Sequence, residues 1–476
     1  MPGQPVRIAI IGAGFTGTVL AVHLLRTVQA PIKILLFDRR GTFGRGLAYS
    51  AHNPRHLLNT RVSNMSVFED DPHHFIRWLW ANDSIYGETP GVPPSGHAFV
   101  SRATYGAYVE DVFLSAVRAA EDRRIKIVQA VDDVVDLQPA GDSVTLTLAD
   151  RQTVDVDFAI LCFGNFPPNP PFPIDATLYD SGRCIIDPWN ENAIGRIGQH
   201  DSVVIVGTGL TMVDVAIDLD ARGHAGPIHA LSRHGLLPLR HELTRSYPLF
   251  LDKESLPLSI ATLMKRVRRE IRRAAAFEYD WRCAMDALRP IIQDIWITMP
   301  EAERRRFLRH LRPYWDIHRH RMAPSIADQI ENWRRSSRLT IEAGRILGAT
   351  FDDGQVHVAY RPRNCADRVT AAADWMINCA GPEYDYRRVD HPLVQSLFAS
   401  DIARADSLAL GLDLSPRSAL IDADGKASRR LFALGPPTRG LLWESTAVPD
   451  IRKQCARFAR QLGEDIARIA VEFPPD

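Results

Sequence analysis

The sequence predicts an α/β fold in which two similar βαβ-based domains carry a helical insertion. The first observation is an apolar strand, a glycine-rich turn and a helix at residues 6–28. The second is the return of the same order from residue 202. The third is a stretch of amphipathic helical pattern at residues 241–339, followed by further strand-like segments. Duplicated units of this kind are typical of proteins with two Rossmann-like halves.

The composition is that of an ordinary globular protein, with 476 residues of which 45% are hydrophobic and 24% charged. This length fits two or three domains. The 57 Lys and Arg balance the 57 Asp and Glu, which argues against nucleic acid as a partner and favours a small molecule. The N-terminal apolar run turns glycine-rich, and no stretch approaches the roughly 18 apolar residues of a membrane span. We therefore expect a cytoplasmic protein, and its oligomeric state stays open.

The pattern also predicts domain boundaries. The first domain is expected at residues 1–165 and 370–476, the second at 166–240 and 340–369, and the helical insertion at 241–339. Amphipathic stretches in the insertion cover residues 259–277, 280–296 and 300–315. Residues 261–345 contain 19 Lys or Arg against 11 Asp or Glu. A solvated helix face and an anion-attracting surface both fit this excess of positive charge.

The six cysteines are scattered, without a CxxC pair or metal-ligand spacing. A disulfide reductase that relays electrons through such a dithiol is therefore not expected. Cys162 and Cys379 lie in apolar strand-like runs, where small core residues are the simpler interpretation. His318 and His320 lack a third ligand of evident spacing, so no metal is expected.

The first glycine turn, Gly12-Ala13-Gly14-Phe15-Thr16-Gly17, follows an apolar strand. Gly12 permits the tight turn, Gly14 lets the backbone approach a pyrophosphate, and Gly17 lets the helix pack closely on the strand. The helix N-terminus offers unbonded N–H groups to the phosphates. The next strand ends in Asp38, placed to accept a hydrogen bond from a ribose 2′-hydroxyl, and Arg39 beside it is counted in the same site. These residues predict a dinucleotide site, and the choice between FAD and NAD stays open.

The second glycine turn, Gly207-Thr208-Gly209, also follows an apolar strand, but Met212 occupies the position of the third glycine. The strand after it ends in Ser232 and Arg233 instead of an acid. An arginine here can pair with a 2′-phosphate while the serine adds a hydrogen bond, which favours NADPH, with NADH as the alternative. An exposed arginine unrelated to a nucleotide is the competing interpretation.

Four further segments carry a more specific resemblance. The two most specific are GTFGRGLAYSAHNPRHLLNTRVSNMS, directly after Arg40, and GPPTRGLLWESTAVPDIRKQ near the C-terminus; the others are GHAFVSRATYGAYVE and SRHGLLPLRH. Over nearly its whole length the chain resembles the bacterial FAD/NAD(P)-binding family that includes FAD-dependent urate hydroxylase and aspartate N-monooxygenase. The resemblance implies FAD in the first site and NAD(P)H in the second.

The resemblance also implies which residues lie along the FAD. They are Arg45, Gly46, His56, Leu57, Leu58, Asn59 and Met65 in the first segment, Arg102 and Tyr105 in the third, and Thr438, Arg439, Gly440 and Trp443 near the C-terminus. For Tyr105, packing in the core is the competing interpretation. Gly435-Pro436 occupies the place where related flavoproteins carry Gly-Asp, so the ribityl contact is unassigned.

Two short segments resemble the crossovers that join FAD and NADPH domains in such enzymes. They are residues 161–165 and 378–382, which contain Gly164 and Gly381. Cys162 and Phe163 replace the usual small residues of this pattern, so the first match is loose.

The activity implied by the resemblance is that of an FAD-dependent monooxygenase. NAD(P)H reduces FAD, O2 adds to form a peroxyflavin, and this species hydroxylates a small anionic substrate, either urate-like or an amino acid. No catalytic triad is needed or found, and the catalytic residues are unknown. Two other classes stay open: an NAD(P)H-dependent flavin oxidoreductase or oxidase that inserts no oxygen, and a non-catalytic nucleotide-binding regulator.

Arg319 and Arg321 in the insertion are the candidates for holding the substrate. Two neighbouring guanidinium groups can clamp a carboxylate or urate-like anion through bidentate hydrogen bonds. Pairing of these arginines with nearby acids is the competing interpretation.

Overall fold

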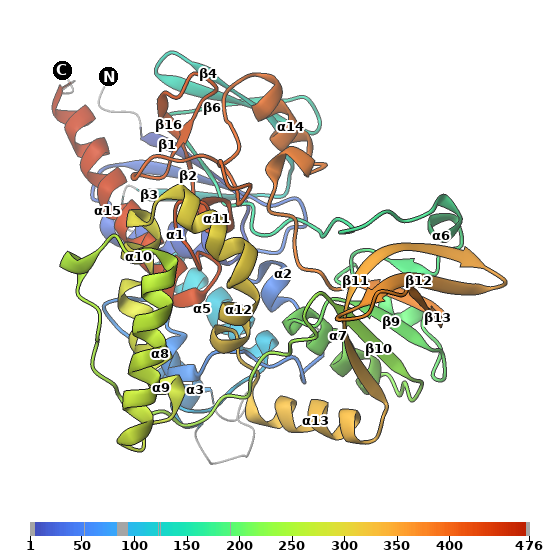
Figure 1. The fold of residues 1–476 in the computed structure, drawn as a ribbon. Helices are drawn as coiled ribbons and strands as arrows, with labels where there is room; N and C mark the ends of the chain where they lie inside the picture. The colour runs from blue at the N-terminus through green and yellow to red at the C-terminus, as the bar shows by residue number, and fades with distance from the viewer. Residues whose placement is uncertain are drawn as a thin grey trace. The chain divides into compact units, whose positions relative to one another are not determined.

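The structure, a computed structural model, describes residues 5–51, 53–82, 94–121, 123, 125–190 and 192–472. The chain divides into two compact units. Unit 1 consists of Met1–His52, Thr60–Phe166 and Glu383–Asp476, and unit 2 of Asn53–Asn59 and Pro167–Pro382. Each unit has its own mostly parallel sheet covered by helices (Figure 1), which confirms the predicted α/β class with two Rossmann-like halves.

The described part of unit 1 is built on a six-stranded sheet with the order β15-β16-β7-β1-β2-β3. These strands are β1 (Val6–Ile11), β2 (Ile32–Phe37), β3 (Ile125–Ala130), β7 (Phe158–Leu161), β15 (Ala419–Ile421) and β16 (Ala427–Ala433). β1 pairs in parallel with β2 and β7, and β7 pairs in parallel with β16. The central strands are almost continuous runs of Ile, Leu, Ala and Phe because both faces of a parallel sheet are covered.

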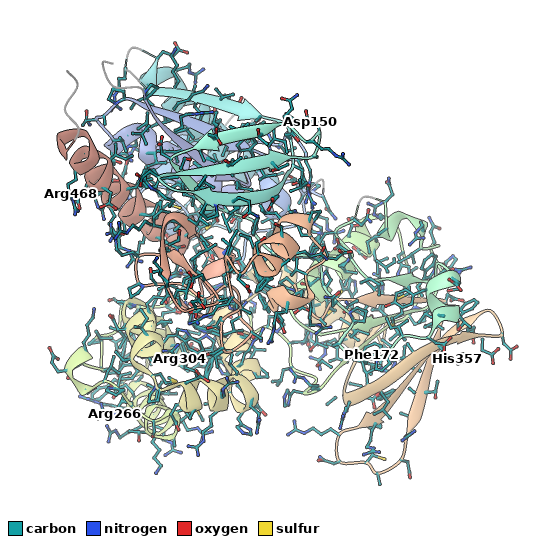
Figure 2. All side chains as sticks on the ribbon, turned by 90° about the horizontal axis from the view of Figure 1, so that it is seen from above. Asp150, Phe172, Arg266, Arg304, His357 and Arg468 are labelled. Carbon is teal, nitrogen blue, oxygen red and sulfur yellow. The ribbon has the colours of Figure 1, made fainter. Side chains whose placement is uncertain are left out.

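Helices α1 (Phe15–Thr27), α5 (Arg102–Ala120) and α15 (Val448–Glu472) pack together on this sheet, with α1 in contact with both others (Figure 1). The smaller helices are α2 (Gly46–Tyr49), η1 (Val62–Asn64), α3 (His74–Ala81), η5 (Tyr386–Arg388), α14 (Pro392–Ala399) and η6 (Pro436–Thr438). A separate sheet of β4 (Val134–Ala140), β5 (Ser143–Leu148) and β6 (Thr153–Val156) packs against α14, and Figure 2 shows Asp150 at its β5–β6 turn.

The described part of unit 2 has a seven-stranded sheet with the order β13-β12-β11-β10-β9-β14-β8. These strands are β8 (Cys184–Ile185), β9 (Val203–Val206), β10 (Ile228–Ser232), β11 (Leu339–Asp352), β12 (Gln355–Pro362), β13 (Val369–Ala373) and β14 (Trp375–Asn378). β9, β10 and β14 form a parallel centre, whereas β11, β12 and β13 form an antiparallel edge on which Figure 2 labels His357.

The chain returns to unit 1 later than the sequence pattern suggested. We placed this boundary at residue 370, but β13 pairs with β12 and β14 pairs with β9. The apolar run of β14 fills the place beside β9 that β7 occupies beside β1 in unit 1. Assignment of the two units to FAD and NAD(P)H stays a prediction.

The helical segment of unit 2 is interrupted by prolines. Its helices are α8 (Ile260–Ala276), α9 (Trp281–Ala287), α10 (Ile292–Thr298), α11 (Glu301–His310), α12 (Arg312–Arg319) and α13 (Pro324–Arg335). Elsewhere in the unit lie α6 (Ala176–Asp180) and α7 (Leu210–Ala221). The 3-10 turns of unit 2 are η2 (Ile194–Arg196), η3 (Lys253–Ser255) and η4 (Arg289–Ile291). The stretches at 280–296 and 300–315 each break, because Pro290 and Pro313 lack the N–H that continues a helix.

Many arginines of this segment bond to neighbouring helix residues. Figure 2 labels Arg266 on α8 and Arg304 on α11, which donate to Ser255 Oγ at 3.2 Å and to the Met299 carbonyl at 2.8 Å. Among the described helices of the whole chain, none combines the length and apolar character needed to cross a membrane.

His23 makes the folding of unit 1 sensitive to acid. It lies on α1 with 4% of its surface exposed, and its Nε2 is 3.3 Å from the Val67 carbonyl oxygen. Burial, reinforced by Arg26, lowers the pKa of His23 from 6.5 to about 4. The folded state therefore resists protonation, and stability present above pH 6.5 is lost as the pH falls towards 4.

We expect the His23→Gln variant to lose less stability on acidification. Between pH 7 and pH 5 the wild-type chain should lose about 2 kcal/mol more unfolding free energy than the variant, because an unfolded histidine binds a proton that His23 in the folded chain does not. Urea unfolding of both proteins at the two pH values measures this difference. Equal losses of unfolding free energy in the two proteins would show that His23 does not cause the acid sensitivity.

Candidate functional site

The first glycine turn admits no side chain at two of its three glycines. Gly12 has φ +102°, and a Cβ there would lie 2.4 Å from the Cys162 carbonyl oxygen at the end of β7. A Cβ on Gly17 would lie 1.9 Å from the Gly12 carbonyl oxygen. The turn is therefore as tight as the motif predicts, with α1 packed directly against it.

The N-terminus of α1 is left free of side-chain hydrogen bonds. Gly14 is its N-cap, no side chain caps it, and no acid lies in its first turn. By contrast, Ser101 caps α5 and Ser259 caps α8 through their side chains. Unbonded N–H groups and the positive end of the helix dipole at α1 suit a phosphate.

Asp38 reaches the same turn from β2. Its Oδ2 accepts a hydrogen bond from the Ala13 N–H at 3.3 Å, and its Oδ1 accepts one from the Arg40 N–H at 2.9 Å. The carboxylate is thus fixed beside the turn and partly open to solvent, whereas Arg39 is exposed.

The Arg45 segment packs onto the glycine turn. The Gly44 N–H donates to the Ala13 carbonyl oxygen at 3.0 Å, and a Cβ on Gly46, whose φ is +53°, would lie 2.8 Å from Gly14 Cα. Arg45 is held by Glu110 of α5 through hydrogen bonds of 2.7 and 3.0 Å. The structure therefore brings Arg45 and Gly46 to the turn, and their contact with FAD stays a prediction.

The C-terminal segment reaches the same place. Gly435 has φ +75°, and a Cβ there would lie 2.5 Å from Thr16 Oγ1. Gln454 of α15 accepts a hydrogen bond from the Gly435 N–H at 2.9 Å and donates one to Thr438 Oγ1 at 3.2 Å. Thr438 in turn donates to the Gly435 carbonyl oxygen at 2.7 Å. Gln454 thus fixes the turn that leads into Arg439.

Arg439 and Trp443 lie together in unit 1. Arg439 Cζ is 4.1 Å from the ring centroid of Tyr384 and 4.7 Å from that of Trp443. Arg439 is 8% exposed and Trp443 3% exposed. Gly440 follows directly, and a Cβ on it would lie 2.3 Å from Asp406 Cγ, so only glycine fits there.

Tyr105 belongs to an aromatic cluster. It is fully buried, and its ring contacts those of Phe15, Tyr49, Phe75 and Tyr108 at centroid distances of 4.7 to 6.0 Å. Burial raises the pKa of Tyr105 well above its ordinary value. These contacts fit the core interpretation, and contact of Tyr105 with FAD stays a prediction.

Met65 and Arg102 lie elsewhere in unit 1. Met65 is 2% exposed, and Arg102 is the first residue of α5. Their place along FAD stays a prediction.

Residues 56–59 belong to unit 2. His56 Nε2 lies 3.0 Å from the Asp214 carbonyl oxygen on α7, and its ring contacts Trp189. Asn59 provides a carbonyl oxygen 3.0 Å from His241 Nε2. The structure does not place His56, Leu57, Leu58 and Asn59 in the unit that holds the first glycine turn, and their contact with FAD stays a prediction.

The second glycine turn repeats the construction of the first. Gly207 has φ +104°, and a Cβ there would lie 2.3 Å from the Cys379 carbonyl oxygen at the end of β14. Gly209 is the N-cap of α7, without a side-chain cap or an acid in the first turn. No atom lies within 4 Å of a Cβ built on Gly209. Met212 stands at the position of the third glycine and is fully buried in the core of unit 2. Its side chain occupies space that a glycine would leave for closer packing of the helix.

Ser232 and Arg233 lie beside this turn. Ser232 Oγ accepts a hydrogen bond from the Gly235 N–H at 3.0 Å and lies 2.9 Å from Thr208 Oγ1. Arg233 is exposed and forms no ion pair with any described residue. Burial, followed by the charges of Arg233 and Arg363, lowers the pKa of His234, which keeps the imidazole neutral beside these arginines.

Both crossovers end in a glycine beside open space. Gly164 has φ +75° and Gly381 has φ +96°, each two residues after the cysteine that contacts a glycine turn. No atom lies within 4 Å of a Cβ at either position. Phe166 and Glu383, which follow them, form an antiparallel bridge.

Arg319 and Arg321 are already paired within the helical segment. Arg319 Nη1 is 3.6 Å from Asp286 Oδ1, and Arg321 donates to the same carboxylate. Their side chains are 7% and 2% exposed. The guanidinium charges meet a carboxylate of α9, so both arginines already have a partner in the helical segment, and substrate binding by them stays a prediction.

Sequence reasoning missed Gln454 and Tyr384. Gln454 lies within the C-terminal segment that carries the resemblance, and a buried polar residue on the apolar side of α15 was a usable signal. Tyr384 gave none, because its packing against Arg439 joins residues far apart in the sequence.

The fold and the two glycine turns define an α/β protein with two Rossmann-like units. Residues 9–166 match the family model described as FAD-NAD(P)-binding, which confirms the resemblance for this part of the chain. The sequence matches no curated protein among those compared.

Solved structures share the fold over nearly the whole chain. Ornithine hydroxylase from Pseudomonas aeruginosa is 15% identical, with 97% of this chain and 99% of that chain covered and a TM-score of 0.63. Ornithine N-hydroxylase from Kutzneria sp. 744 is 11% identical, with 98% and 100% covered and a TM-score of 0.63. The cadaverine monooxygenase of Erwinia amylovora, bound to FAD, is 12% identical, with 97% and 95% covered and a TM-score of 0.63. At these identities the comparison establishes the fold.

The residues present fit dinucleotide phosphates at both turns. The N-termini of α1 and α7 have no side-chain cap, and the space beside Gly164, Gly209 and Gly381 is open. A ligand backbone can therefore approach where any side chain would obstruct it.

Gly209→Ala should weaken NADPH binding while leaving the fold intact. The new methyl group meets no protein atom within 4 Å and Gly209 has φ −83°, so the protein tolerates it. It fills the space where the pyrophosphate would approach, and we expect Kd for NADPH to rise about tenfold or more. Calorimetric titration measures Kd, with Gly348→Ala on β11 as a control in the same unit. An unchanged Kd for NADPH in Gly209→Ala would refute the assignment of NADPH to this turn.

Proposed function

We propose that this chain is an FAD-dependent, NADPH-using monooxygenase that hydroxylates a small amino-acid-like substrate. One observation carries the proposal: two glycine turns of the same construction occur in separate units, each with a free helix N-terminus. The first is accompanied by Asp38 and the second by Ser232 and Arg233. An acid suits a ribose and an arginine suits a 2′-phosphate, so the two turns favour different nucleotides.

The similar solved structures support a hydroxylase. These proteins are named as hydroxylases or monooxygenases of ornithine and cadaverine, and two of the structures contain FAD or NADP+. Amines and amino acids are common to these names, which favours an amino-acid-like substrate over a urate-like one. Hydroxylation at an amine nitrogen is the reaction that we propose.

The chain's own residues position the two nucleotides. The N-terminus of α1 and the Gly12–Gly17 turn bind the pyrophosphate of FAD, and Asp38 binds its ribose. The N-terminus of α7 binds the pyrophosphate of NADPH, and Ser232 and Arg233 bind its 2′-phosphate. When bound, FAD supplies electron transfer from NADPH and the activation of O2.

Substrate-stimulated NADPH consumption tests the proposal. The FAD-loaded protein is incubated with NADPH, O2 and, in turn, L-ornithine, L-lysine, L-aspartate, cadaverine or urate, and products are identified by mass spectrometry. We expect one amine or amino acid to accelerate NADPH oxidation and to gain one oxygen atom. Peroxide formation regardless of substrate would instead indicate an oxidase or reductase. An unchanged flavin spectrum after NADPH addition would indicate a non-catalytic regulator.

Arg233→Ala should discriminate between the two nicotinamide nucleotides. Loss of the guanidinium removes the partner of the 2′-phosphate, which NADH lacks, so Kd should rise about tenfold to a hundredfold for NADPH and little for NADH. Arg345→Ala, which removes another exposed arginine of unit 2, is the matched control. An equal effect of Arg233→Ala on both nucleotides would refute the 2′-phosphate assignment.

A further inference from the structure

The guanidinium of Arg439 is a buried cation for which the described residues supply no counter-ion. Arg439 as a whole is 8% exposed. Its Nε is fully buried, and no described acceptor lies at hydrogen-bond distance from it. Within the described part of the chain, no carboxylate lies at ion-pair distance from it and no acceptor bonds to its terminal nitrogens. Burial of an unpaired charge is strongly unfavourable, so this arrangement needs a compensating anion.

The surroundings hold Arg439 in place before any ligand arrives. The rings of Tyr384 and Trp443 lie against it at 4.1 and 4.7 Å and partly stabilise its charge. Gln454 fixes the preceding turn through Gly435 and Thr438. Ring contacts do not satisfy N–H donors, so the hydrogen-bonding capacity of Arg439 is unused.

A carboxylate matches this unused capacity. A guanidinium presents its donors in a planar fork that fits the two oxygens of a carboxylate. The other arginines considered for this task, Arg319 and Arg321, already bond to Asp286. Arg439 is therefore the better anion receptor.

We propose that Arg439 binds the carboxylate of the substrate and so selects amino acids over amines of the same chain length. This inference rests on the proposed function, because it names the substrate class of the same reaction. The competing source of an anion is a phosphate of FAD itself, for which the N-terminus of α1 already provides a site. The two sources make different predictions for a variant without the guanidinium.

Matched pairs of small molecules test the proposal. L-lysine and cadaverine, L-ornithine and putrescine, and L-aspartate and β-alanine each differ only by the α-carboxylate. Binding to the FAD-loaded protein is measured by calorimetry for the wild type, Arg439→Met, Arg439→Lys and the control Arg430→Met. Arg430 lies over the Phe158 ring in the same unit but already pairs with Asp142, at 3.2 Å.

The wild type should bind at least one amino acid about tenfold or more tightly than its decarboxylated partner. Arg439→Met should abolish that preference and keep its FAD, Arg439→Lys should retain part of it, and Arg430→Met should retain it fully. Three results would overturn the proposal: a wild type with no preference in any pair, an unchanged preference in Arg439→Met, or loss of FAD from Arg439→Met and Arg439→Lys. A wild type that prefers carboxylates but oxidises no NADPH would contradict the proposed function and leave the role of Arg439 intact.

Discussion

Within each unit, the turn from the central strand into the helix depends on the close approach of a backbone carbonyl to a glycine. Gly12 faces the carbonyl oxygen of Cys162, and Gly207 faces that of Cys379, at separations that no Cβ can accept. This contact turns the chain from a central strand directly into a helix. The N-termini of α1 and α7 are thereby left at the carboxyl edges of their sheets, where unbonded N–H groups suit phosphates. Side chains at the ends of the adjacent strands, Asp38 in one unit and Arg233 in the other, then distinguish the two turns.

The first turn is additionally enclosed by segments that come from far along the chain. Gly46 packs on Gly14, and Gly435 packs on Thr16, so each contact again requires the absence of a side chain. Gln454 joins the C-terminal helix to the turn at Gly435. These contacts position Arg439 in a buried place where it has aromatic neighbours and, among the described residues, no counter-ion. At the second turn no described atom lies within 4 Å of a Cβ built on Gly209, and the buried Met212 stands in place of a third glycine.

Local features of the fold were predictable from sequence, because a strand, a glycine turn and a helix are encoded by adjacent residues. The α/β class is confirmed, and the structure places Asp38 and Ser232 beside their turns. Features that depend on distant partners were not predictable. Nothing in the local pattern shows that Arg321 bonds to Asp286, or that β14 joins the sheet of unit 2. The helix breaks at Pro290 and Pro313 could have been predicted, because proline lacks the N–H that continues a helix. The amphipathic pattern runs on through both prolines and does not show the breaks.

We propose that one chain holds two different nucleotides at once, in two separate units. The most direct measurement is a calorimetric titration of NADP+ into protein saturated with FAD, together with the FAD content before and after. One NADP+ should bind per chain, and all FAD should remain bound. Displacement of FAD by NADP+, or binding of NADP+ only to FAD-free protein, would show a single shared site and would contradict the claim.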